Sequence, residues 1–277
     1  MNLLNRIIKR IKTEIILYLP YTSKKKTIAN LIVSFTSYPA RLNKIHLVIR
    51  SILHQTIRPE AIILWLGTDT SQELIPNKLQ KLKKHGLIIK SGYEDLKPHK
   101  KYFFAMQEYP EKVIVTIDDD TMYEKHMLED LYNSYKKYPE AVSARRVTLM
   151  TKKSNNELSS YSDFIFEYQN TMEPTNALMA IGVGGVLYPP RALSKDAFDS
   201  KTVKKTCLNT DDIWLKFMEI KNNTGVVFVK SNLEKDLTIR KTQETALMHE
   251  NIDNGNQNDI SIKAIQDAIK LNMADYI

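Results

Sequence analysis

The sequence predicts an α/β fold in which a largely parallel sheet is flanked by helices. Three observations support this prediction. Short apolar runs alternate with segments of helical periodicity in residues 29–150. An acidic triplet follows the fourth run, at the sheet edge where such proteins bind ligands. The 277 residues are 43% hydrophobic and 26% charged, a composition typical of a folded domain with a substantial core.

The order of the elements follows from the apolar patterning. Strands are expected at 31–35, 61–66, 87–90, 112–117, 141–147 and 225–230. Helices are expected at 47–53, 75–86, 124–139, 209–219 and 258–269. The second of these helices ends at Gly86, as a glycine C-cap would have it.

Residues 1–28 form a separate basic, amphipathic segment, and residues 29–277 are expected to form one continuous domain with a regular half (29–150) and a less regular half (151–277). Apolar residues of the first segment recur at helical spacing, and basic residues fill the other face. Such a helix either lies on an anionic membrane surface or packs its apolar face on the domain. Neither the ~20-residue apolar run of a membrane span nor the features of a signal peptide are found.

Charge and cysteine content narrow the classes of partner. The net charge of +8 favours an anionic partner. The positive charge is dispersed, however, and no recognisable nucleic-acid-binding motif is found, so we expect no nucleic-acid partner. Cys207 is the single cysteine, which excludes an intrachain disulfide and a metal site built from a cysteine cluster.

The triplet Asp118, Asp119 and Asp120 is the first candidate for chemistry. Oxygen ligands suit Mg²⁺ or Mn²⁺, which enzymes commonly bind through one or two carboxylates and substrate phosphates. The alternative is a polar strand end that caps the next helix. A strand that runs directly into three aspartates favours the metal interpretation.

A second acidic pair, Asp211 and Asp212, stands at the start of a predicted helix. A positioned carboxylate can act as a general base toward a hydroxyl, whereas acids at a helix start also simply favour the helix dipole. The stretch from Gly182 to Gly185 concentrates three of the chain's eight glycines. It indicates either close approach of a ligand or a tightly packed bend.

A basic run, His99, Lys100 and Lys101, precedes an aromatic-rich helical segment. Cations are unfavourable at a helix start, so these residues would serve an external anion such as a diphosphate. A solvated basic loop is the alternative.

These motifs occur in an order that resembles the bacterial family-2-like glycosyltransferases of the GT-A fold, a Rossmann-like architecture. The resemblance rests on "IVSFTSYPARL", "SILHQT", "VIVTIDDDTMY", "GVGGVLYPP" and "TDDIWL", within residues 30–260. It implies metal-dependent transfer of a sugar from a nucleotide-diphosphate sugar to an acceptor hydroxyl, with inversion of the anomeric centre, in capsular or surface polysaccharide synthesis. The two halves of the domain would then bind the nucleotide sugar and the acceptor.

The resemblance also implies roles for individual residues. Asp118 and Asp120 match the DxD motif that binds Mn²⁺ or Mg²⁺, and Asp212 or Asp211 matches the catalytic base. The remaining implied donor-site residues are Thr36, Ser37, Tyr38, Arg41, Asp69, His99, Lys100, Lys101 and Asp119. Gly184, Gly185 and Trp214 would contact the acceptor or the sugar, and His249 would be a third metal ligand. The chain departs from the family pattern at "WLGTDT", where Asp69 replaces an acidic pair.

Two other functions were weighed. The motif "DDDT" also fits a haloacid-dehalogenase-like phosphatase, although that class places its nucleophile after the first strand. A non-catalytic carbohydrate- or membrane-binding module is disfavoured by the two intact acidic clusters. The sequence thus predicts a cytoplasmic glycosyltransferase, peripheral on the inner face of the plasma membrane if residues 1–19 bind it, with a saccharide or lipid-linked saccharide as acceptor.

Overall fold

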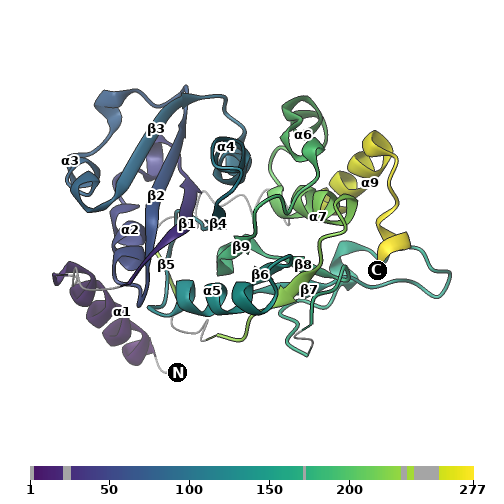
Figure 1. Ribbon diagram of the computed structural model, residues 1–277, viewed down its shortest axis with the longest axis horizontal. Coiled ribbons are helices and arrows are strands. Elements are labelled where there is room, and N and C mark those ends of the chain that lie inside the picture. The colour runs from purple at the N-terminus through teal and green to yellow at the C-terminus, as the bar shows by residue number, and fades with distance from the viewer. Residues whose placement is uncertain (1–2, 21–25, 171–172, 232–235, 240–255) are drawn as a thin grey trace.

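The computed structural model describes residues 3–20, 26–170, 173–231, 236–239 and 256–277, with side chains from residue 10 onward. Its centre is a seven-stranded sheet of order β10-β6-β9-β4-β1-β2-β3 (Figure 1). In chain order the strands are β1 (Thr27–Thr36), β2 (Arg58–Gly67), β3 (Leu87–Tyr93), β4 (Val113–Thr116), β6 (Val142–Ala144), β9 (Val186–Tyr188) and β10 (Val226–Phe228). Strands from both halves of the chain therefore belong to one sheet.

Strand direction decides which loops meet. β9 runs antiparallel to both of its neighbours, β4 and β6, while the other pairs in the sheet are parallel. The amino end of β9 therefore lies at the same edge as the carboxyl ends of the six other strands. Thr116 at the end of β4 pairs with Ser34 on one side and Val186 on the other. The aspartate triplet and the glycine-rich stretch consequently emerge side by side.

Helices cover both faces of this sheet. Helices α2 (His46–Leu53) and α5 (Met127–Lys137) lie on one face, and α4 (Lys100–Glu108) and α7 (Asp211–Lys221) on the other. The remaining helices are α1 (Leu3–Tyr18), α3 (Asn77–Gln80), α6 (Ser200–Thr206) and α9 (Gln257–Ile269). Small two-stranded sheets add β5 (Thr121–Met122) with β11 (Leu237–Thr238), and β7 (Val147–Leu149) with β8 (Leu178–Ala180).

Alternation along the strands builds the two cores. Leu31 and Val33 of β1 point into the cluster under α2 and α5, whereas Ile32 points into the cluster under α4. A β-strand sends successive side chains to opposite faces, so a strand that is apolar throughout must be covered on both. The mostly parallel α/β architecture predicted from the sequence is therefore confirmed.

Two predicted elements differ from the structure. The helix expected at 75–86 is α3 followed by a 3₁₀ turn at Lys83–His85, because hydrogen bonds of the tighter i to i+3 type begin at Leu82. Gly86 ends this turn with a φ of 99°, as a C-cap glycine does. The strand expected at 141–147 divides into β6 and β7 around Arg145, whose side chain is fully buried.

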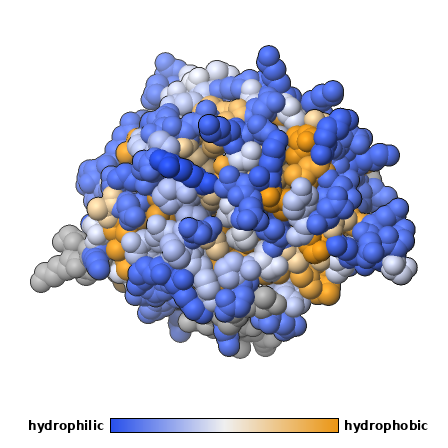
Figure 2. All heavy atoms as spheres, turned by 45° about the vertical axis from the view of Figure 1, so that its right-hand side comes forward, coloured by the Kyte–Doolittle hydropathy of each residue, from blue (hydrophilic) through white to orange (hydrophobic). Residues whose placement is uncertain are grey.

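The surface is mostly hydrophilic on the face that Figure 2 shows, where apolar residues form separate areas. Within the described residues, no helix has the length and apolar character needed to span a bilayer.

Candidate active site

The candidate site lies at the sheet edge where the carboxyl end of β4, the amino end of β9 and the amino end of α7 meet. Its centre is Lys101, on the first turn of α4. The Nζ atom of Lys101 lies 2.9 Å from an oxygen of Asp118 and 2.9 Å from an oxygen of Asp211. One ammonium group thus joins Asp118, which follows β4, to Asp211 on α7, although the two residues are ninety-three positions apart in the sequence. We call Lys101, Asp118, Asp211 and Asp212 the carboxylate cluster.

Asp212 joins the cluster through Gly182, which precedes β9. The backbone N–H of Gly182 donates to both carboxylate oxygens of Asp212, at 3.2 Å each. A Cβ atom at this glycine would lie 3.0 Å from Lys101 Nζ, 3.1 Å from Asp212 Oδ1 and 3.7 Å from Asp118 Oδ1. The missing side chain therefore lets the backbone approach the cluster closely, at a position where a Cβ atom would crowd Lys101 and Asp212.

The two neighbouring carboxyls of α7 are driven to opposite protonation. Burial works to raise the pKa of Asp211, but the charges of Lys101 and His99 together with the hydrogen bonds to the carboxylate lower that pKa. Burial also raises the pKa of Asp212, and the adjacent Asp211 raises it further, to about 8. Lys101 is itself buried, yet the three surrounding aspartates hold its pKa well above the usual range. Asp211 is consequently an ionised partner of Lys101, whereas Asp212 is mostly protonated at pH 7 and ionises near pH 8.

Asp119 binds side chains of the loop after β1 rather than the carboxylate cluster. Its carboxylate accepts hydrogen bonds from Ser37 Oγ at 2.5 Å and from Arg41 Nη1 at 2.5 Å, and its side chain is 8% exposed. Arg41 Nη1 also lies 3.4 Å from Asp120, and Cζ of Arg41 lies 5.3 Å from the centre of the Tyr38 ring. These contacts fix the loop after β1 against the loop after β4.

Asp120 carries negative charge that its surroundings do not fully compensate. Burial, and then the charges of Asp118 and Asp119, raise its pKa to about 6 despite the presence of Arg41. A divalent cation would relieve this repulsion, and carboxylate oxygens are the ligands that Mg²⁺ and Mn²⁺ prefer. Within the described ranges, no group of three His, Cys, Asp or Glu side chains is arranged to bind a metal ion alone. Asp118 and Asp120 would thus supply two oxygen ligands, and a cation bound there would need its remaining ligands from outside these side chains.

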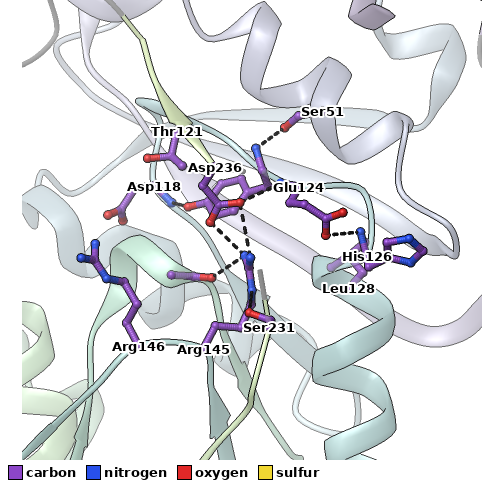
Figure 3. A network of polar contacts seen from close by, with 12 residues as sticks. Ser51, Asp118, Thr121, Glu124, His126, Leu128, Arg145, Arg146, Ser231 and Asp236 are labelled. Atoms are coloured by element: carbon purple, nitrogen blue, oxygen red, sulfur yellow. Dashed lines mark hydrogen bonds and ion pairs between the residues drawn. The ribbon is translucent and has the colours of Figure 1, made fainter. Parts of the chain in front are cut away.

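A buried network supports the loops from behind (Figure 3). The guanidinium of Arg145 donates to Asp236 at 3.1 Å, to Ser231 at 2.7 Å and to the carbonyl oxygen of Gly184 at 3.0 Å. Asp236 also accepts from the backbone N–H of Glu124 at 2.8 Å. The network thus ties the glycine-rich stretch to the segment that follows the aspartates. Gly184 is occupied with this structural contact, and Gly185, with a φ of 82°, packs against Met127.

The basic run is placed differently from the expectation. Lys100 pairs with Asp95, and His99 is 0% exposed, with hydrogen bonds to Tyr102 and to the carbonyl oxygen of Cys207. Lys101 is buried among aspartates. Each of the three side chains is hydrogen-bonded or ion-paired within the chain, so none of them is directed at an external anion.

Three other residues also lie apart from the cluster. Trp214 is 0% exposed in the core and donates to the carbonyl oxygen of Ala197, so it offers no ring face to a sugar. Asp69 is exposed at the end of β2, where Thr70 donates to it. The hydroxyl of Thr36 donates to the carbonyl oxygen of Trp65 instead of contacting the carboxylate cluster. His249 lies outside the described residues.

Sequence reasoning named the stretch from Gly182 to Gly185 but did not single out Gly182, and it missed the central position of Lys101. Gly182 belongs to the glycine-rich stretch, but nothing in the sequence separates it from Gly184 and Gly185. Lys101 could have been found only by knowing that the first turn of α4 faces the end of β4, because Lys100 beside it has the same chemistry.

Comparisons with known proteins add two distant likenesses. The chain resembles the UTP-bound UGPase from Acinetobacter baumannii over 89% of its own length and 99% of that chain, at 11% identity and a TM-score of 0.39. It resembles HddC from Yersinia pseudotuberculosis over 80% of its own length and 100% of that chain, at 12% identity and a TM-score of 0.42. No family model and no curated protein matches the chain. Both TM-scores are below 0.5, so the function is argued from the residues of this chain alone.

Proposed function

We propose that this protein transfers a sugar from a nucleotide-diphosphate sugar to an acceptor hydroxyl. The observation that carries the proposal is the convergence of Asp118, Asp211 and Asp212 on Lys101 at the ligand-binding edge of a mostly parallel sheet. Buried carboxylates repel one another, and a bound cation or reacting group can offset that repulsion. The order of motifs in the sequence, which resembles GT-A glycosyltransferases, supports the same reaction.

In this proposal the carboxylates divide the work. Asp118 and Asp120 would hold a divalent cation, which supplies charge neutralisation for the donor diphosphate as it leaves. Asp119 does not contact substrate but positions the loop of Ser37 and Arg41, from which a nucleotide would be bound. Gly182 would hold the carboxylate of Asp212 in place through its backbone N–H.

Asp212 is the residue we assign as general base. Its carboxylate is oriented by the N–H of Gly182, and its pKa of about 8 makes the ionised form, which is populated increasingly as the pH rises toward 8, a stronger proton acceptor than an exposed aspartate. Asp211 cannot readily do the same, because it is committed to Lys101. The proposed acceptor is a saccharide or lipid-linked saccharide in surface polysaccharide synthesis, with inversion at the transferred carbon.

The test is release of nucleoside diphosphate from a panel of nucleotide sugars in the presence of Mn²⁺ and simple sugar acceptors. Asp212→Asn should lower turnover by roughly 10²–10⁴-fold, the range for loss of a general base, and leave donor binding within about twofold. Asp267→Asn, an exposed aspartate on α9, is the matched control and should retain full turnover.

Equal activity of Asp212→Asn and the control would refute the assignment of the base. Hydrolysis of a generic phosphate ester, without turnover of any nucleotide sugar, would replace the proposed reaction with that of a phosphatase.

A further inference from the structure

A second candidate site lies between α1, α2 and the segment 78–85, away from the carboxylate cluster. A cavity of ≈ 240 Å³ is lined by Tyr18, His46, Arg50, Lys78, Lys81, Leu82, Lys84 and His85. This space is many times the roughly 10–15 Å³ that one water molecule needs. No lining residue is acidic, and four are arginine or lysine. The residues around the cavity therefore carry a net positive charge, and the cavity wall itself is largely apolar.

The cations of this cavity are not neutralised from within. In the parts of the chain that the structure describes, Lys78, Lys81 and Lys84 form no ion pair. Arg50 donates to the backbone carbonyl oxygen of Leu17 and lies 4.7 Å from the centre of the Tyr18 ring, so its position is fixed while its charge stays uncompensated. This arrangement contrasts with Lys101, whose charge is balanced by aspartates.

His46 reports the resulting positive potential. Its two ring nitrogens lie 3.0 Å from the hydroxyl of Tyr18 and 3.0 Å from the carbonyl oxygen of Asn43. Burial lowers its pKa, and the charges of Lys78 and Arg50 lower it further. A bound anion would oppose the last two effects.

Helix α1, which contributes Tyr18 to the cavity, also carries an exposed apolar face. Among the described residues, five of the eleven exposed large apolar side chains lie within residues 11–19. Ile11, Ile15 and Leu19 follow the i, i+4 spacing of one helix face and are 52%, 57% and 53% exposed. Leu17, on the opposite face, is buried in the core and anchors the helix.

Charge complementarity selects the occupant. Isoleucines that stand in water beside a cluster of unpaired lysines match the two layers of an anionic bilayer surface, its apolar interior and its phosphates. We propose that the cavity binds the phosphate of an anionic phospholipid while the exposed face of α1 enters the same membrane surface. This inference goes beyond the proposed function and does not depend on the reaction that the carboxylate cluster catalyses.

Vesicle flotation of the full chain tests the proposal. Vesicles of phosphatidylcholine alone are compared with vesicles that also contain phosphatidylserine or phosphatidic acid. The triple variant Lys78→Ala, Lys81→Ala, Lys84→Ala changes exposed side chains outside the candidate active site. The matched control removes the same charge from exposed lysines near α6, through Lys195→Ala, Lys201→Ala and Lys205→Ala.

The expected result is binding to the anionic vesicles and a roughly hundredfold loss in the cavity variant, since each lysine near an anionic surface contributes about a fivefold factor. The control should lose less than about threefold. Equal losses in the two triple variants would overturn the proposal, because net charge alone would then drive binding. Equal binding to phosphatidylcholine vesicles would overturn it as well, because the apolar face would then suffice.

A second measurement separates lipid from free phosphate. NMR titration of His46 in the presence of inorganic phosphate reports occupancy of the cavity by an upward shift of the histidine pKa. A shift with inorganic phosphate but no binding to anionic vesicles would assign the cavity to a free phosphate group and reject the lipid. Substitution of Ile11, Ile15 and Ile16 by serine should reduce vesicle binding at least tenfold yet leave that titration unchanged; unaltered vesicle binding would remove α1 from the proposal.

Discussion

The carboxylate cluster and the basic cavity handle charge in opposite ways. At the cluster, three aspartates surround one buried lysine and nearly every charge has a partner within the chain. At the cavity, an arginine and three lysines face the same space without a carboxylate among the lining residues. Charges buried in a protein must be paired, whereas exposed charges tolerate a missing partner. Breaking an ion pair of the cluster should therefore lower the free energy of unfolding strongly, whereas the cavity is open to a ligand.

The largest effect on stability should come from Lys101. Lys101→Ala leaves Asp118 and Asp211 without their counter-ion, and such a loss typically costs about 3–5 kcal/mol. Urea unfolding would measure it. Adding Asp211→Asn should recover part of the loss, since it removes one uncompensated carboxylate.

The matched control is Lys204→Ala, which breaks a surface ion pair with Glu94 and should cost about 0–1 kcal/mol. If both lysine variants lost the same small amount, the cluster would not be the buried ion-pair network that its geometry indicates.

An intermediate effect should appear at a second buried pair, Lys216 and Glu219, both on α7. Their charged atoms lie 3.3 Å apart, and both side chains are almost fully buried. Burial raises the pKa of Glu219 to about 7, which Lys216 only partly offsets. The folded-state pKa of Glu219 exceeds the unfolded value near 4.5. The contribution of this carboxyl to the free energy of unfolding is therefore fully present below pH 4.5. It is then lost as the pH rises to about 7, by at most roughly 1.4 kcal/mol per pH unit.

Glu219→Gln should therefore flatten the decline of unfolding free energy between pH 4.5 and 7, as measured by urea unfolding at several pH values. Glu111→Gln, at an exposed pair with Arg191, should leave the profile unchanged. Identical profiles for wild type and Glu219→Gln would show that Glu219 is ionised across this range.

The smallest effect on stability should come from the cavity. Lys78→Ala removes an exposed, unpaired charge, so the free energy of unfolding should change by less than about 0.5 kcal/mol. The pKa of His46 should nevertheless rise, because Lys78 lowers it in the intact protein. NMR titration would detect this rise. An unchanged pKa would mean that the charge of Lys78 does not act on His46.

Much of the fold could be predicted because it depends on local patterning. The apolar runs located β1 to β4, and the Asp118 triplet located the end of β4 correctly. The antiparallel direction of β9 could not be predicted, since a three-residue strand carries no directional signal and its place depends on contacts with β4 and β6.

The candidate site was predictable by residue type but not by partner. Asp211 and Asp212 stood out as an acidic pair, yet their separation into an ion-pair partner and a basic carboxylate depends on Lys101 and Gly182 from distant segments. Trp214 illustrates the opposite error, because an aromatic beside two acids in the sequence points into the core once α7 forms. Helical geometry, rather than sequence proximity, decides which neighbours reach the site.

The most direct test of the proposed donor site is thermal unfolding against a panel of nucleoside diphosphates, with and without Mn²⁺. A ligand that binds only the folded state raises the melting temperature, by roughly 5–10 °C at a hundredfold excess over its dissociation constant. The proposal predicts such a rise with one nucleoside diphosphate, dependent on Mn²⁺ and lost in Asp120→Ala but retained in Asp267→Asn. No shift with any nucleotide, or an undiminished shift in Asp120→Ala, would contradict it.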